Sequence, residues 1–82
     1  MIDAAQIRAA RALLNISQTD LAESASVHVA TIRRLEAAST VRGNAESLMK
    51  IEKALEGLGV EFLPLGEDRG PGVCLRKNVQ TP

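Results

Sequence analysis

Aromatic residues are almost missing from this sequence of 82 residues, in which Phe62 is the only one. A hydrophobic core must therefore be built from leucine, isoleucine, valine and alanine, which favours helices packed closely through small residues. A single domain of this length buries only about 60% of the surface that its unfolded chain exposes. A partner subunit would add to its stability.

Cysteine and histidine are equally scarce, with one residue of each, Cys74 and His28. The lone cysteine cannot form an internal disulfide, and no Cys/His cluster has the spacing of a metal site. The sequence also offers no paired carboxylates and no glycine-rich phosphate loop. Because no catalytic chemistry is assembled, we expect neither an enzyme nor a cofactor.

A long hydrophobic run is missing too, so the sequence predicts no membrane span and no signal peptide. The net charge is zero, which argues against indiscriminate binding to polyanions. The charges are nevertheless segregated, because three arginines and one acid, Glu36, lie between His28 and Asn44. A locally basic face on a neutral protein favours recognition over bulk electrostatic attraction.

Two short amphipathic helices joined by a tight turn are predicted for residues 18–35. Their apolar positions are spaced to face one core: Leu21, Ala22, Ala25, Val27, Ile32 and Leu35. Only a small residue fits at Ala22, since two helices that cross steeply bring their backbones close together. The other face of the second helix is basic and nearly free of carboxylates, which suits the major groove of DNA.

This pattern closely resembles the DNA-binding domain of the Cro/CI-type bacterial regulators, the xenobiotic-response-element (XRE) family. The resemblance covers roughly residues 4–58, and its main features are Gln18, Leu21, Ala22, Val27 and the run from Thr31 to Glu36. It implies an all-α, lambda-repressor-like domain of four to five short helices. The family usually has glycine where Ser26 stands, so a left-handed backbone is expected there at a cost on the order of 1 kcal/mol. It also prefers a serine or threonine helix cap where His28 stands.

The resemblance assigns base-edge contacts to the second helix, the reading helix, at His28, Val29, Ala30 and Arg34. Arg33 lies near enough to the rim of the groove to contact either bases or backbone. Arg34 is the strongest candidate, because an arginine forking onto guanine O6 and N7 contributes about 1–3 kcal/mol of discrimination. For Arg33 and Arg34 the alternative is a solvated charged face, with Glu36 as a pairing partner. For His28, the alternative is that it occupies the helix-cap position without contacting a base, and the two interpretations have equal weight.

Contacts to the DNA backbone are implied for Gln18, Thr31, Ser39, Thr40 and Arg42. Gln18 opens a helix whose free amides offer bonds to the same phosphate, and the last three residues belong to the loop after the reading helix. The Thr31 hydroxyl could equally bond back to its own helix. Arg8 and Arg11 fall on the outer side of the first helix, where they reach a phosphate or stay solvated.

The flanking segments read as supporting helices. Asp3 and Gln6 have the spacing of a capping box, Asn15 ends the first helix and Ser17 caps the next. Buried stripes are predicted for the first helix and for a fourth helix over residues 45–58, at Ile7, Ala10, Leu13, Leu14, Leu48, Ile51, Leu55 and Leu58. Gly59 suits a left-handed end to the fourth helix.

After Gly59, two short strand-like runs at residues 60–63 and 73–76 enclose a segment rich in glycine and proline. They predict a loose hairpin, similar to the C-terminal extension of many small proteobacterial members of the family. We expect an exposed strand edge to join two subunits through Val60, Phe62, Val73 and Leu75. The chain thus divides into a DNA-binding part (1–59), a dimerisation element (60–77) and a frayed tail (78–82).

The sequence therefore predicts a regulator that binds double-stranded DNA sequence-specifically, as a homodimer on a near-palindromic operator. Repression or autoregulation of a promoter is the expected outcome, in the cytoplasm and at the nucleoid. The alternative is an antitoxin or anti-regulator whose main role is to sequester a protein partner.

Overall fold

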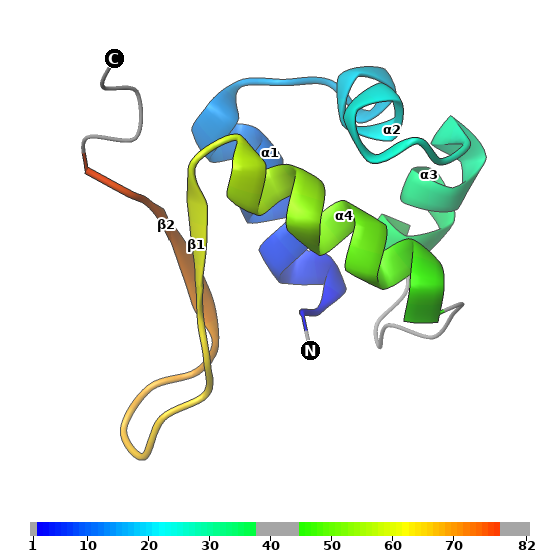
Figure 1. The fold of residues 1–82 in the computed structure, drawn as a ribbon. Coiled ribbons are helices and arrows are strands. Elements are labelled where there is room, and N and C mark those ends of the chain that lie inside the picture. The colour runs from blue at the N-terminus through cyan, green and yellow to red at the C-terminus, as the bar shows by residue number, and fades with distance from the viewer. Residues whose placement is uncertain (1, 38–44, 78–82) are drawn as a thin grey trace.

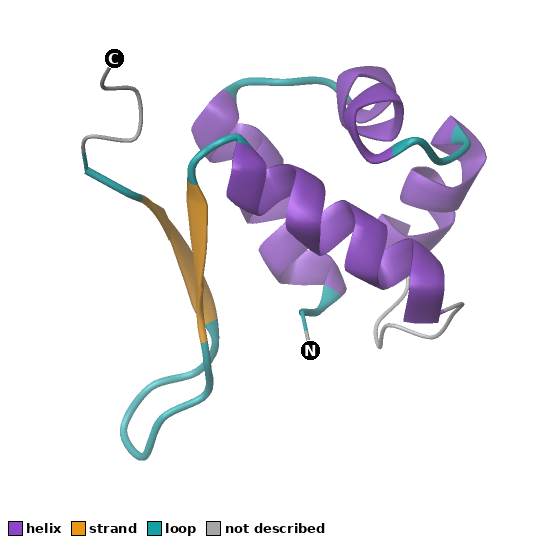
Figure 2. Ribbon diagram, in the orientation of Figure 1, coloured by secondary structure: helices purple, strands orange, loops and turns teal. Residues whose placement is uncertain are grey.

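The computed structural model describes residues 2–37 and 45–77 of the chain. Its elements are α1 (Ala4–Leu14), α2 (Gln18–Ala25), α3 (Val29–Ala37), α4 (Ala45–Gly57), β1 (Val60–Leu63) and β2 (Gly72–Leu75). The four helices form one bundle, and the two strands stand at its side as an antiparallel hairpin (Figures 1 and 2). This architecture confirms the expected fold class, a lambda-repressor-like helical domain with a short β extension.

The ends of α1 follow from its capping residues. Asp3 Oδ1 accepts a hydrogen bond from the Gln6 amide at 2.8 Å, and Gln6 Oε1 accepts one from the Asp3 amide at 2.9 Å. This reciprocal pair is the predicted capping box. At the other end Asn15 adopts the left-handed conformation, with φ 58°, and ends the helix as expected.

The turn between α2 and α3 depends on Ser26, whose φ of 59° is left-handed. The amide of Ser26 donates to the Glu23 carbonyl, and the amide of Val27 donates to the Ala22 carbonyl. These two bonds form a Schellman motif, in which the left-handed residue closes the helix. Serine therefore takes the conformation expected at this position, although it lacks the freedom of glycine. Ser17 caps the start of α2 as predicted, with Asp20 as its capping-box partner.

The core contains residues from all four helices and from β1. Its fully buried large side chains are Ile7, Leu21, Ile32, Leu35, Ile51, Leu55 and Val60. Ala22 is also buried, which fits the need for a small residue where α2 packs against α3. Two predicted core positions are wrong: Leu58 is 42% exposed because α4 ends before it at Gly57, and Leu13 is 44% exposed on the outside of α1.

The hairpin pairs Val60 with Leu75 and Phe62 with Val73. It is docked rather than loose, since Phe62 and Val73 pack against the helical core. The expectation that Val60 lies on an exposed edge is wrong, because its side chain is fully buried among the helices. Strands and helices therefore share one core.

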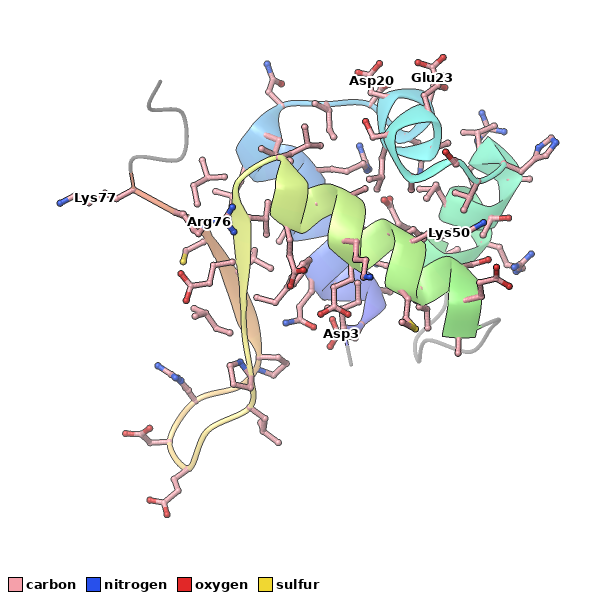
Figure 3. The ribbon with its side chains drawn as sticks, viewed as in Figure 1. Asp3, Asp20, Glu23, Lys50, Arg76 and Lys77 are labelled. Atoms are coloured by element: carbon pink, nitrogen blue, oxygen red, sulfur yellow. The ribbon has the colours of Figure 1, made fainter. Side chains whose placement is uncertain are left out.

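Two polar side chains tie the hairpin to the bundle. Gln6 is buried, and its Nε2 donates to the carbonyls of Gly72, at 3.0 Å, and Leu63, at 3.4 Å. The guanidinium of Arg76 donates to the Glu56 carbonyl at the end of α4, at 2.9 Å (Figure 3). Gln6 thus joins the cap of α1 to the loop end of the hairpin with one amide group.

Replacing Gln6 with methionine should destabilise the fold, because the substitution keeps the side-chain length but removes its hydrogen bonds. We expect the free energy of unfolding to fall by about 2 kcal/mol, the combined cost of losing the bond from the Asp3 amide and the two bonds to the hairpin carbonyls. Urea denaturation measures the change. Lys53→Met, on the exposed side of α4, is the control and should stay within about 0.5 kcal/mol of the wild type. Equal stability of the two variants would contradict the role of Gln6.

Candidate nucleic-acid interface

Helix α3 has one face in the core and one face in solvent. Ile32 and Leu35 are fully buried, and Glu36 is 5% exposed. The opposite face carries the exposed side chains of His28, just before the helix, and of Ala30, Arg33 and Arg34. Among the residues described in α3, the exposed face therefore contains cations and small side chains but no carboxylate.

The residues expected to contact bases differ in their exposure. His28, Ala30, Arg33 and Arg34 are exposed together, whereas Val29 is half-buried and packs partly against the protein's own core. The amide of Thr31 donates to the His28 carbonyl at 3.0 Å, which places His28 at the first turn of α3. Arg33 and Arg34 thus extend from a helix whose start is fixed by the turn at Ser26.

The residues expected to contact phosphates are placed only in part. Gln18 begins α2 and Thr31 lies on α3, both half-buried. The remaining candidates, Ser39, Thr40 and Arg42, lie outside the described residues. Gln18 does not simply extend into solvent, because its Nε2 donates to Glu36 Oε1 at 3.1 Å.

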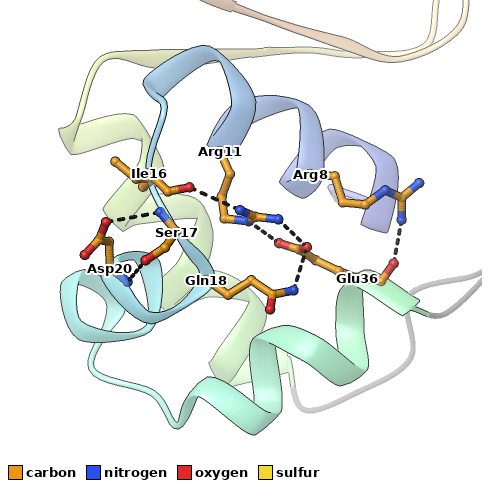
Figure 4. Close-up of polar contacts among 7 residues, drawn as sticks. All are labelled: Arg8, Arg11, Ile16, Ser17, Gln18, Asp20 and Glu36. Carbon is orange, nitrogen blue, oxygen red and sulfur yellow. Dashed lines mark hydrogen bonds and ion pairs between the residues drawn. The ribbon is translucent and has the colours of Figure 1, made fainter.

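Glu36 is the centre of a polar cluster that joins α1, α2 and α3 (Figure 4). Its two carboxylate oxygens receive a fork from Arg11: Nε donates to Oε2 at 2.7 Å and an Nη donates to Oε1 at 2.9 Å. Arg11 also donates to the Ile16 carbonyl at 3.1 Å, and Arg8 donates to the backbone carbonyl of Glu36. The cluster fixes the end of α3 against α1 and against the chain that leads into α2.

The electrostatics of the cluster favour a charged Glu36. Burial opposes ionisation of the carboxyl, but hydrogen bonds from Arg11 and Gln18 and the charges of Arg11 and Arg8 outweigh it, so the pKa of Glu36 lies below its ordinary value of 4.5. The hydrogen bond to Glu36 likewise raises the pKa of Arg11. The pair is therefore ionised throughout the neutral range.

This cluster corrects two expectations from the sequence. Arg11 is neither solvated nor free to reach a phosphate, because its side chain is 21% exposed and is paired with Glu36. Glu36 is not the partner of Arg33 or Arg34, because its carboxylate faces Arg11 and Gln18 instead. The partners are 25 residues apart in the chain, and neither helical periodicity nor local spacing reveals a contact over that distance.

Comparison with known proteins identifies the family. A helix-turn-helix family model matches residues 7–63, more than half of the chain. The chain belongs to this helix-turn-helix family. The match confirms the Cro/CI-type resemblance, and a helix-turn-helix protein of this type is a DNA-binding transcriptional regulator. A separate comparison with curated proteins found no match.

Three further observations concern the residues that the structure describes. Within residues 2–37 and 45–77, none of the helices combines the length and the apolar character needed to cross a bilayer. In the same part of the chain, no three histidine, cysteine, aspartate or glutamate side chains are grouped as metal ligands would be. The single cysteine, Cys74, is half-buried and lies on β2, within the second strand-like run predicted from the sequence.

The ion pair predicts a defined dependence of stability on pH. Because the folded-state pKa of Glu36 is lowered, the pair stabilises the fold above the unfolded-state pKa, and this contribution is lost as the pH falls through the folded-state pKa. Glu36→Gln should therefore lower the free energy of unfolding at neutral pH by about 3 kcal/mol. The difference from the wild type should shrink as the solution is acidified.

Urea denaturation across a pH series measures this effect. Glu23→Gln, which removes an exposed carboxylate from α2, is the matched control and should follow the wild type at every pH. If the free energy of unfolding of Glu36→Gln differed from that of the wild type by the same amount at every pH, the lowered pKa assigned to Glu36 would be contradicted.

Proposed function

We propose that this regulator binds double-stranded DNA sequence-specifically through the outer face of α3, as a homodimer on a near-palindromic operator. One observation carries the proposal. The only acid of α3, Glu36, is buried and neutralised by Arg11, so the exposed surface of the helix is basic, with Arg33 and Arg34 in solvent. A protein without net charge thus has a local site for the electronegative major groove.

The chemistry of the exposed side chains supports base reading. The major groove is about 12 Å wide and admits one helix, and guanine offers O6 and N7 to a forked arginine. Arg34 would make this contact, and Arg33 would reach a base or the rim of the groove. Ala30, together with the exposed part of Val29, would contact thymine methyl groups, and His28 would meet a base near the start of the helix.

Backbone contacts would fix the register of α3 in the groove. Gln18 and the first amides of α2 would bind one phosphate, the Thr31 hydroxyl could bind another, and Ser39, Thr40 and Arg42 would extend the contact along the strand. Binding at such a site would occlude a promoter. Repression, including repression of the protein's own promoter, is the outcome we propose.

The open edge of β2 is the surface we propose for the dimer. The amide of Arg76 donates to the Gly59 carbonyl at 2.8 Å, so alternation along the ladder turns the backbone groups of Leu75 and Val73 away from β1. Leu75 is 45% exposed beside this edge. Phe62 would contribute its half-buried ring, whereas Val60 is already enclosed in its own subunit. A second copy paired here would carry the other reading helix to a half-site about 34–36 Å away.

Arg34→Ala should relax the base preference of the protein. We expect duplexes selected from a random pool to lose one guanine position and the affinity for the wild-type site to fall by about 1–3 kcal/mol. Arg42→Ala should instead weaken binding to all sequences equally and reduce its salt dependence. The exposed Lys53 of α4 provides the control, since Lys53→Ala should leave base preference, affinity and salt dependence unchanged. Unchanged base preference in Arg34→Ala would refute its assignment.

Leu75→Lys should shift the full-length protein towards the monomer, because a lysine beside the strand edge opposes pairing with a second strand. Sedimentation velocity over a concentration series measures the shift. Leu65→Lys, at a site 73% exposed in the hairpin loop, introduces the same charge and should leave the oligomeric state unchanged. A Leu75→Lys protein that sediments like the wild type would place the subunit contact elsewhere.

A further inference from the structure

We propose that Glu36 is a positioning residue for Gln18, and that it holds the side-chain amide of Gln18 with one N–H free for a DNA phosphate. The inference rests on the proposed function, because it assigns to Glu36 a part in how that site binds the DNA backbone. Glu36 itself would not touch DNA, since its side chain is 5% exposed. It would act only through the residue that it holds.

The contact between the two side chains determines how the amide is oriented. A carboxylate can only accept hydrogen bonds, whereas a glutamine amide has an accepting oxygen and a donating nitrogen. Because Gln18 Nε2 lies 3.1 Å from Glu36 Oε1, the nitrogen must face Glu36. The amide group of an unrestrained glutamine can rotate by half a turn. Its oxygen would then face an approaching anion and repel that anion.

The orientation leaves Gln18 equipped to bind an anion. Its Nε2 carries two hydrogens, of which Glu36 takes one, so the second remains for an acceptor outside the protein. A phosphate oxygen is such an acceptor, and a hydrogen bond to a charged acceptor is stronger than one between neutral groups. The buried carboxylate thus selects the donating side of a neutral residue at the surface.

Arg11 makes the arrangement rigid. Its fork occupies both oxygens of Glu36, and its remaining nitrogen donates to the carbonyl of Ile16, two residues before Gln18 (Figure 4). One guanidinium therefore fixes both the carboxylate and the backbone that leads to Gln18. Side chain and main chain at the start of α2 are set in relation to α3 before any DNA arrives.

The charge of Glu36 would otherwise oppose DNA binding. Arg11 pairs with the carboxylate, and Arg8 adds a second positive charge beside it. A purely electrostatic view therefore predicts that removing the acid leaves DNA affinity unchanged or raises it. The positioning role predicts that removing the acid lowers DNA affinity, so a measurement of affinity distinguishes the two explanations.

The first test uses the free protein and needs no DNA. In ¹⁵N-edited NMR spectra of the wild type, the two Nε2 protons of Gln18 should be widely separated, because only one is bonded to a carboxylate. Glu36→Gln should reduce that separation towards the value of a solvent-exposed glutamine, while Glu23→Gln should leave it intact. Gln18 protons that already resemble an exposed glutamine in the wild type would overturn the inference, whether or not the variants fold.

The second test is a thermodynamic cycle on DNA affinity, using a duplex that the wild type selects from a random pool. Gln18→Ala should weaken binding about tenfold in the wild type, the effect of losing one hydrogen bond to a charged group. In a Glu36→Gln background the same change should cost less than about twofold, because Gln18 is no longer held there. Glu23→Gln, as the matched control background, should retain the full tenfold loss.

The outcomes separate this inference from the proposed function. A wild type that selects and binds no duplex contradicts both. A wild type that binds its duplex, with Gln18→Ala costing the same in the Glu36→Gln background as in the wild type, overturns the positioning role and leaves the proposed function standing. Tighter binding by Glu36→Gln would likewise assign Glu36 a repulsive role and reject the positioning one.

Discussion

The ion pair between Arg11 and Glu36 is the interaction on which the rest of the DNA-binding surface depends. It lies where α1, α2 and α3 meet, and its fork of two hydrogen bonds closes the side of α3 that faces the protein. Removing either partner leaves the other, largely buried charge unpaired, and this strongly lowers the free energy of unfolding. By enclosing the single acid of α3, the pair leaves an outer face on which Arg33 and Arg34 carry the only charges.

The hairpin extends this arrangement through α1. Gln6 joins the start of α1 to the strands, and Arg11, at its other end, joins it to α3. A small domain with one aromatic residue has little apolar surface to bury. Strand β1 adds the fully buried Val60 to the core that the helices form. The strands are thus part of the fold as well as the surface proposed for a second subunit.

Local chemistry in the sequence predicted most of the fold. The capping box of Asp3 and Gln6, the left-handed residues Asn15 and Ser26 and the stripe through Ile51 and Leu55 all depend on residues within one or two helical turns. The prediction failed at Leu58, where the periodic pattern continues beyond the end of the helix.

The site was predicted less completely, because its main contacts join distant parts of the chain. The exposed positions of Arg33 and Arg34 followed from helical periodicity. Helical periodicity did not reveal the pairing of Arg11 with Glu36 or the hydrogen bond from Gln18 to Glu36, since both depend on how three helices pack. Likewise, alternation along β1 indicated which residues share a face, but only the packing of the strands on α1 and α4 distinguished the buried Val60 from the exposed Leu75.

Intermolecular nuclear Overhauser effects between the protein and a duplex selected from a random pool test the central claim most directly. We expect contacts from the Arg34 side chain to a base in the major groove, and none from α4 or from the hairpin loop. Contacts that place the duplex against α4 or the hairpin, with the outer face of α3 in solvent, would contradict the account.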